Sequence, residues 1–231
     1  MTDRLKIGIL QTGLVPEDLV AEFGEYPEVF MSFLSGYGFD FDRYCVVRGE
    51  FPSGPEAADG WLITGSRHGV YEDHAWIPPL EQLVRGAFGA DRPVVGICFG
   101  HQIIAQALGG TVEKYADGWA IGPQSYDING QDITLNAWHQ DQVITPPKGA
   151  QTVGGNDFCT HAALLYPGQA YSVQPHPEFS DAYTQALIDT RGPGLVPQNI
   201  LKDAAAQLGV PLSSKVLADQ FARFFRERRL A

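Results

Sequence analysis

The stretch Val94 to Gln102, with the sequence VVGICFGHQ, constrains this chain more than any other. An apolar run ends in Gly-x-Cys-x-Gly, and the apolar residues that follow recur at helical spacing until Gly109. This pattern predicts a buried strand, a sharp turn that carries Cys98, and a helix. Flanking glycines allow close backbone approach, and the helix N-terminus favours a thiolate. Cys98 is therefore a candidate nucleophile, and the alternative is a small apolar side chain that ends a buried strand.

Short apolar strands alternate with amphipathic helices in the first hundred residues. Strands are expected at 6–10, 41–47, 61–63 and 94–97, and helices at 19–34 and 77–88, the first helix with a break at Pro27. This alternation indicates βαβ units and a parallel sheet with helices on both faces. Because chemistry gathers at the carboxyl ends of strands in such sheets, Gly13, Gly65 and Cys98 should meet in one crevice.

The pattern changes after the predicted helix that follows Cys98. Residues 111–173 read as short strands joined by turns, and Asn129-Gly130 predicts a two-residue hairpin turn. We expect these strands to extend the same sheet in antiparallel fashion. Helical periodicity returns from about Ser180, and no linker divides the chain, so residues 1–231 are expected to form a single domain with extra C-terminal helices.

Composition limits the kinds of partner. The formal charge of −11 argues against nucleic-acid or anionic-membrane surfaces and favours a small molecule or another protein. The apolar run at 7–10 is too short for a signal peptide, and no stretch could span a bilayer, so a cytoplasmic location is expected. The three cysteines, at wide spacing, form neither a disulfide framework nor a Cys-x-x-Cys site.

A cysteine nucleophile needs a base, and two His-x-acid pairs could supply it. His176 and Glu178 lie two apart in an extended segment, so their side chains point to the same side, and His139 and Asp141 have the same spacing. The residues alone leave both pairs open. The four groups could also form a metal set, but that would leave the cysteine unexplained, so no metal and no cofactor is expected.

The other four histidines have no persuasive partner in the sequence. They are interpreted as surface, capping or packing residues, with His101 as a further candidate for the pocket lining; the four are His68, His74, His101 and His161.

The segment Gly96–Gln102, together with His176-Pro177-Glu178, resembles the class I (triad) glutamine amidotransferase domain. The resemblance is strongest to the amidotransferase part of GMP synthase and its free-standing relatives, and it runs from about Lys6 to about Phe179. It implies an α/β fold of the flavodoxin-like kind, with a doubly wound, mostly parallel (mixed) sheet flanked by helices.

The resemblance also implies a role for each matching residue. Cys98 would be the nucleophile, His176 the base and acid, and Glu178 the group that orients the imidazole. The backbone N–H groups of Gly65 and Phe99 would form the oxyanion hole. The residues implied in substrate binding are Gln102, Asn136, Ala137, Trp138 and His139.

The implied activity is that of a glutamine amidotransferase or glutaminase, which releases ammonia and glutamate through a γ-glutamyl thioester. No pyrophosphatase-like Ser-Gly-Gly-x-Asp-Ser loop accompanies the motifs, so a first reading is a subunit that serves a separate synthetase. A second reading is a stand-alone γ-glutamyl peptidase, hydrolase or transferase, which needs a pocket open enough for a bulky leaving group. A third reading is a non-catalytic binding or regulatory protein on the same fold.

Overall fold

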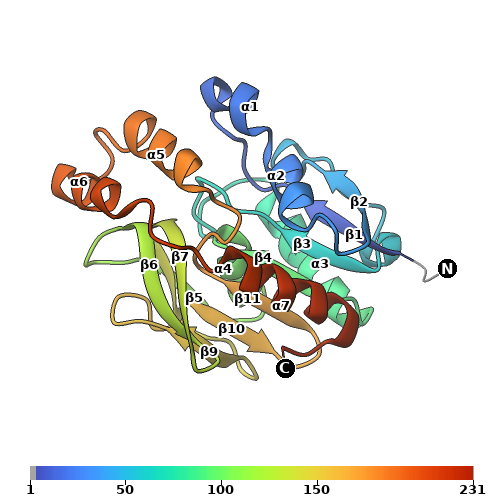
Figure 1. Cartoon of the computed structure of the whole chain (residues 1–231). Helices are drawn as coiled ribbons and strands as arrows, with labels where there is room; N and C mark the ends of the chain where they lie inside the picture. The colour runs from blue at the N-terminus through green and yellow to red at the C-terminus, as the bar shows by residue number, and fades with distance from the viewer. Residues whose placement is uncertain (1–3, 231) are drawn as a thin grey trace.

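The structure is a computed structural model that describes residues 4–230, and within this range the chain is built around one nine-stranded sheet (Figure 1). In spatial order the strands are β2 (Phe39–Tyr44), β1 (Leu5–Leu10), β3 (Gly60–Ile63), β4 (Val94–Ile97), β11 (Ala170–Val173), β10 (Ala163–Tyr166), β9 (Gln151–Gly155), β6 (Ala120–Ile128) and β7 (Gln131–His139). Pairing is parallel from β2 to β11 and antiparallel from β11 to β7. The predicted mixed sheet is thereby confirmed.

Helices cover both faces of this sheet. They are α1 (Glu17–Phe23), α2 (Tyr26–Phe33), α3 (Ile77–Gly89), α4 (Phe99–Ala107), α5 (Asp181–Thr190), α6 (Gln198–Gln207) and α7 (Ser214–Glu227). Aromatic residues of α2 and α7 pack on one face of the parallel strands, and apolar residues of α3 and α4 pack on the other. In Figure 1, α1 lies at the top of the view, with α5 to its left and α6 at the far left. Apolar residues of α1 and α5 form a small core of their own.

Two expectations for residues 111–173 were wrong. Strand β11 is not part of an antiparallel extension, because it pairs in parallel with β4 at the centre of the sheet. Strands β5 (Thr111–Lys114) and β8 (Asp141–Thr145) form a separate two-stranded sheet. Of the four residues in β5 only Val112 is buried, so this strand lacks the two apolar faces that a central position requires.

The strand and helix predicted at 41–47 and 19–34 are present, but their bounds differ from those expected. The strand expected at 41–47 ends at Tyr44, and a 3-10 turn, η1 (Val46–Arg48), follows it. The helix expected at 19–34 is two helices separated at residues 24–25. Pro27 lies at the start of α2 rather than at a break, since the first turn of a helix needs no N–H from proline.

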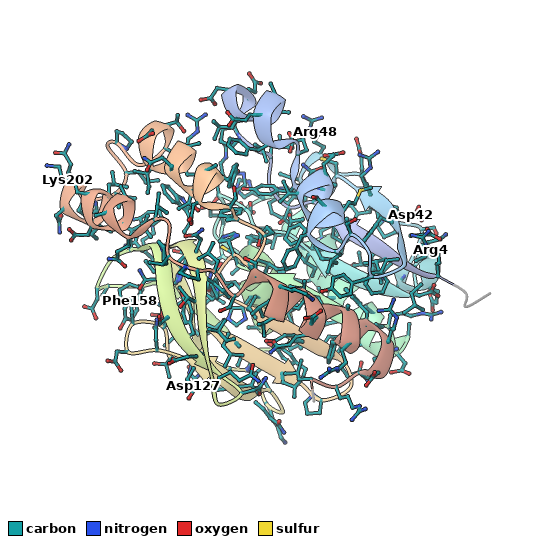
Figure 2. All side chains as sticks on the ribbon, in the orientation of Figure 1. Arg4, Asp42, Arg48, Asp127, Phe158 and Lys202 are labelled. Atoms are coloured by element: carbon teal, nitrogen blue, oxygen red, sulfur yellow. The ribbon has the colours of Figure 1, made fainter. Side chains whose placement is uncertain are left out.

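The Asn129-Gly130 turn is confirmed. Ile128 pairs with Gln131 across it, and Asn129 and Gly130 both have positive φ angles, of 54° and 74°. Asp127, labelled near the end of β6 in Figure 2, accepts a hydrogen bond of 2.8 Å from the Gly130 N–H. Among the described residues no helix has the length and apolar character needed to cross a membrane.

Candidate active site

Cys98 occupies a strained turn between β4 and α4. Its φ and ψ angles are 52° and −104°, a combination that non-glycine residues rarely adopt. The Cys98 N–H donates to the Val173 carbonyl at 2.9 Å, which ties the turn to the end of β11. The side chain is only 6% exposed. The sheet therefore holds Cys98 in a conformation that places its thiol before the N-terminus of α4.

The glycines that flank the turn permit close packing of α4. A Cβ at Gly96 would lie 2.5 Å from the Gly100 carbonyl oxygen, and a Cβ at Gly100 would lie 2.3 Å from the Ile63 carbonyl oxygen. Both distances are far below a normal contact. The Gly-x-Cys-x-Gly spacing thus has the backbone function that the sequence indicates.

His176 lies after the end of β11, on a segment bound to β7. Its N–H donates to the Asn136 carbonyl at 2.8 Å. The Nδ1 atom of His176 lies 2.7 Å from the Oε1 atom of Glu178, and the imidazole stacks on the Phe179 ring at 3.9 Å between centroids. The His176 side chain is 4% exposed and that of Glu178 is fully buried. Packing and a carboxylate therefore fix the orientation of the imidazole.

Cys98, His176 and Gly65 converge on one point. A Cβ built on Gly65 would lie 2.9 Å from the His176 Cε1 atom and 3.7 Å from the Cys98 Cβ atom. Burial lowers the pKa of His176, but the charges of Glu178 and then of Cys98 raise it by more. The pKa of His176 is therefore about 10. An imidazolium at neutral pH is the expected partner of a cysteine thiolate.

The backbone beside Cys98 could supply two donors. The Thr64 carbonyl accepts a hydrogen bond of 2.8 Å from the Thr12 hydroxyl. Because C=O and N–H of one trans peptide point in opposite directions, the Gly65 N–H points away from Thr12. Phe99 is the first residue of α4, where an N–H has no partner within the helix. The oxyanion-hole roles of Gly65 and Phe99 stay predictions.

The rival pair of His139 and Asp141 does not form. The Nδ1 atom of His139 faces the Asp141 backbone carbonyl at 3.3 Å, whereas the Asp141 carboxylate accepts a hydrogen bond of 2.9 Å from the Tyr71 hydroxyl. Burial, and next the charge of His176, lowers the pKa of His139 to about 3, so its imidazole is neutral. The Asp141 carboxylate thus does not orient His139 as a base. The four-residue metal set considered from the sequence is also not assembled.

The residues implied in substrate binding differ in their access to solvent. Trp138 and His139 line hollows at the site, and so does Gln102, whose Nε2 atom donates to the Asp141 carbonyl and to Gln174, both at 3.0 Å. Asn136 and Ala137 are completely buried. The Asn136 amide donates to the Phe179 carbonyl and to Asp181, behind the wall of the site. The role of all five residues stays a prediction.

Several histidine assignments change. His101 is fully buried, and its Nδ1 atom lies 2.9 Å from the Ser172 hydroxyl. It therefore packs between α4 and β11 and does not line the pocket. His68 and His74 do have a partner, since both contact the Glu72 carboxylate. Sequence spacing alone did not reveal this group, because it depends on the path of the loop after β3.

Two hollows of unequal size open at Cys98. The larger has a volume of about 820 Å³, and the residues found only in it include residues 13–18, Tyr26, Leu187 and Arg191. The smaller has a volume of about 190 Å³, and the residues found only in it include Gly69, Tyr71, Glu72, Gln102, Lys114, Trp119, His139 and Asp141. Both hollows are lined by Ser66, Arg67, His68, Cys98, Trp138 and Leu195.

Helix α5 and the segment after it were not expected at the site. Leu187 and Arg191 line the larger hollow, and Leu195 lines both hollows. The Arg191 guanidinium pairs with Asp18, which joins α5 to α1 beside the larger hollow. Phe179, stacked on the imidazole, is a further residue that sequence reasoning missed, although its place three residues after His176 was a usable signal.

Solved structures show the same fold. The chain aligns with a glutamine amidotransferase from Methylobacillus flagellatus at a TM-score of 0.70 and 20% identity, covering 96% of this chain and 92% of that one. It aligns with a glutamine amidotransferase from Thermotoga maritima at a TM-score of 0.69 and 20% identity, covering 95% and 96%.

Sequence comparisons add relatives with named activities. γ-Glutamyl peptidase 4 of Arabidopsis thaliana is 29% identical over 205 residues, which cover 80% of this chain and 81% of the relative. GMP synthase of Leifsonia xyli subsp. xyli is 32% identical over 181 residues, which cover 71% of this chain but 33% of that protein. The family model "Glutamine amidotransferase class-I" matches residues 54–188. The chain therefore belongs to the class I glutamine amidotransferase family.

Proposed function

We propose that this protein is a cysteine-dependent hydrolase of γ-glutamyl amides in which the leaving amine is larger than ammonia. The observation that carries the proposal is the position of Cys98, which lines both the 190 Å³ hollow and the 820 Å³ hollow. A nucleophile between two unequal spaces can divide a substrate into a small acyl part and a larger amine part.

The residue types then define the reaction. The Cys98 thiolate attacks the γ-carbonyl carbon, and the oxyanion accepts hydrogen bonds from the Gly65 and Phe99 N–H groups. His176 gives its proton to the amine nitrogen as the C–N bond breaks, which leaves a γ-glutamyl thioester. The neutral imidazole next takes a proton from water, the hydroxide attacks the thioester, and the C–S bond breaks to release glutamate and restore the thiolate.

The size of the larger hollow supports an amine with a side chain. Its 820 Å³ lies within the range of roughly 300–1,000 Å³ typical of sites for drug-sized ligands. Ammonia, the leaving group from glutamine, would leave this space unused. The similarity to γ-glutamyl peptidases supports the same choice. Because α5 lines this hollow, we also propose that the C-terminal helices belong to one domain with the rest of the chain.

A glutaminase that supplies ammonia to a separate synthetase is the second candidate. The similarity to GMP synthases favours it, since the matched residues form only about a third of the Leifsonia protein and a quarter of the Vibrio vulnificus one. Such a subunit would act on glutamine, and its activity would rise when the synthetase is added.

The first test uses the purified protein alone. We expect glutamate release from γ-glutamyl dipeptides, and a γ-glutamyl adduct on the peptide that contains Cys98 when the reaction is quenched in acid. The Cys98→Ala variant should show neither. Cys45→Ala is the matched control, because burial raises the pKa of this half-buried thiol and it lines neither hollow. Equal glutamate release by wild type and Cys98→Ala would refute the proposal.

A further inference from the structure

The loop between β3 and α3 gathers three metal-ligating side chains that the proposed reaction does not use. His68, Glu72 and His74 place one ligand atom each within 4.8 Å of one another. Among residues 4–230 this is the one such group of three histidine, cysteine or acidic side chains found. The loop also lines the site, since His68 borders both hollows and Glu72 borders the smaller one.

The spacing of the ligand atoms is close to that expected around one ion for His68 and shorter for His74. The His68 Nδ1 atom lies 3.2 Å from the Glu72 Oε2 atom, and the His74 Nε2 atom lies 2.7 Å from the same oxygen. Zinc binds nitrogen and oxygen ligands at about 2.0–2.2 Å, so two ligands at a tetrahedral angle lie roughly 3.3 Å apart. Small side-chain movements would bring all three atoms to this spacing.

Contacts around the group orient its members before any ion binds. The other Glu72 oxygen, Oε1, accepts a hydrogen bond of 3.0 Å from the Gly69 N–H, which turns Oε2 toward the histidines. The His74 ring stacks on Trp76 with 5.8 Å between centroids and 14° between planes. The backbone N–H of His68 donates to the Ser66 hydroxyl at 3.2 Å. The Glu72 contact is of the kind that orients metal ligands, and the other two hold the His74 ring and the loop backbone beside His68.

We propose that His68, Glu72 and His74 bind one divalent transition-metal ion of the Zn²⁺ class at the rim of the active site. Two imidazoles and one carboxylate suit Zn²⁺, whereas Ca²⁺ and Mg²⁺ prefer oxygen ligands alone. The site would leave one coordination position for water, because the three side chains are 20–42% exposed. By joining residues 68 and 74, the ion would stiffen the loop that borders both hollows.

Binding is tested by calorimetric titration of Zn²⁺, with Mg²⁺ as the comparison ion. All variants carry Cys98→Ala, since a thiolate beside His176 could bind Zn²⁺ by itself. We expect one Zn²⁺ per chain, no heat from Mg²⁺, and visible absorption of tetrahedral type when Co²⁺ replaces Zn²⁺. Removing a partner of a metal ligand costs about 10–100-fold in affinity, so removing a ligand, in His74→Ala or Glu72→Gln, should cost at least about 100-fold.

The matched control is His161→Ala. His161 is a partly exposed histidine whose Nδ1 atom forms a hydrogen bond of 2.7 Å with the Thr152 hydroxyl. It lies outside the group, so the His161→Ala substitution should leave the Zn²⁺ affinity unchanged. Circular dichroism checks folding, and if His74→Ala does not fold, Glu72→Gln and His68→Gln decide the result. Zn²⁺ binding that is absent, that is not one per chain, or that survives these substitutions would overturn the proposal.

Hydrogen exchange gives a second readout of the same site. Zn²⁺ should slow amide exchange in residues 66–76 of the Cys98→Ala protein and leave the Glu72→Gln variant unaffected. Equal exchange with and without bound Zn²⁺ would contradict the stiffening of the loop. No turnover is measured in either experiment, so failure of the metal site and failure of the proposed hydrolase activity are distinguishable.

Discussion

The two hollows that meet at Cys98 differ in size and in the elements that form them. The smaller is lined by the loop after β3, by the end of β7 and by Gln102 of α4, with polar side chains such as Lys114 and Asp141. The larger is lined by residues 13–18 and by α5. Under the proposed function the smaller space would hold the constant acyl part and the larger one the variable amine. Changes at the shared centre should therefore affect every substrate, and changes in one hollow should not.

The largest effect is expected from Glu178→Gln. The amide keeps the size of the side chain but removes the charge that stabilises the His176 imidazolium, so kcat should fall by about 10³- to 10⁴-fold for γ-glutamyl dipeptides and glutamine alike. Steady-state glutamate release measures this. Glu56→Gln, at an exposed position that lines neither hollow, is the control. A loss for one substrate alone would break the idea of a shared centre.

Gly65→Ala should have the next largest effect. The new Cβ would lie 2.9 Å from the His176 Cε1 atom, so the imidazole or the oxyanion donor must move by a few tenths of an ångström or more. Displacement of this kind costs about 10²-fold in kcat. Gly89→Ala is the matched control, because its Cβ would meet no atom within 4 Å. Wild-type kcat in a folded Gly65→Ala protein would contradict this prediction.

Leu14→Trp tests the larger hollow by itself. Leu14 is 41% exposed and lines that hollow but not the smaller one. The indole should narrow the space for the amine and lower kcat/KM for dipeptides about tenfold, which corresponds to about 1.4 kcal/mol. For glutamine, kcat/KM should fall by less than about twofold, because its leaving group, ammonia, does not fill the larger hollow. Leu14→Ala is the control, and an equal loss for both substrates would remove the distinction between the hollows.

The last prediction concerns stability as a function of pH, not turnover. Burial lowers the pKa of His176, but Glu178 and Cys98 raise it to about 10, above the value of about 6.5 in the unfolded chain. Above pH 6.5 the native state thus binds more protons than the unfolded state, and its free energy of unfolding should fall as pH rises toward 10. Urea titrations at several pH values should show a shallower fall in Glu178→Gln. Identical slopes would argue against the ion pair.

Sequence patterns indicated the two halves of the candidate site because each half is local. The Gly-x-Cys-x-Gly turn and the spacing of His176 and Glu178 lie within a few residues, so strand and turn geometry place them directly. The choice between His176 and His139 needed the fold or the family resemblance. It depends on Tyr71, which binds the Asp141 carboxylate from 70 positions away in the sequence.

The walls of the site were not predictable in the same way. Leu187 and Arg191 border the larger hollow because α5 packs on α1, and that contact joins residues as far as 173 positions apart in the sequence. Strand β11 enters the centre of the sheet beside β4, although its hairpin partner β10 indicated antiparallel pairing. Long-range packing of this kind leaves little periodic signal in one sequence.

One ratio tests the central claim most directly: kcat/KM for a γ-glutamyl dipeptide divided by kcat/KM for L-glutamine, measured by glutamate release with Cys98→Ala as the blank. Contacts of the amine in the 820 Å³ hollow should contribute about 1–3 kcal/mol to the transition state, so the ratio should be about ten or more. A ratio below one, or turnover of glutamine alone, would contradict the account and favour the ammonia-supplying glutaminase.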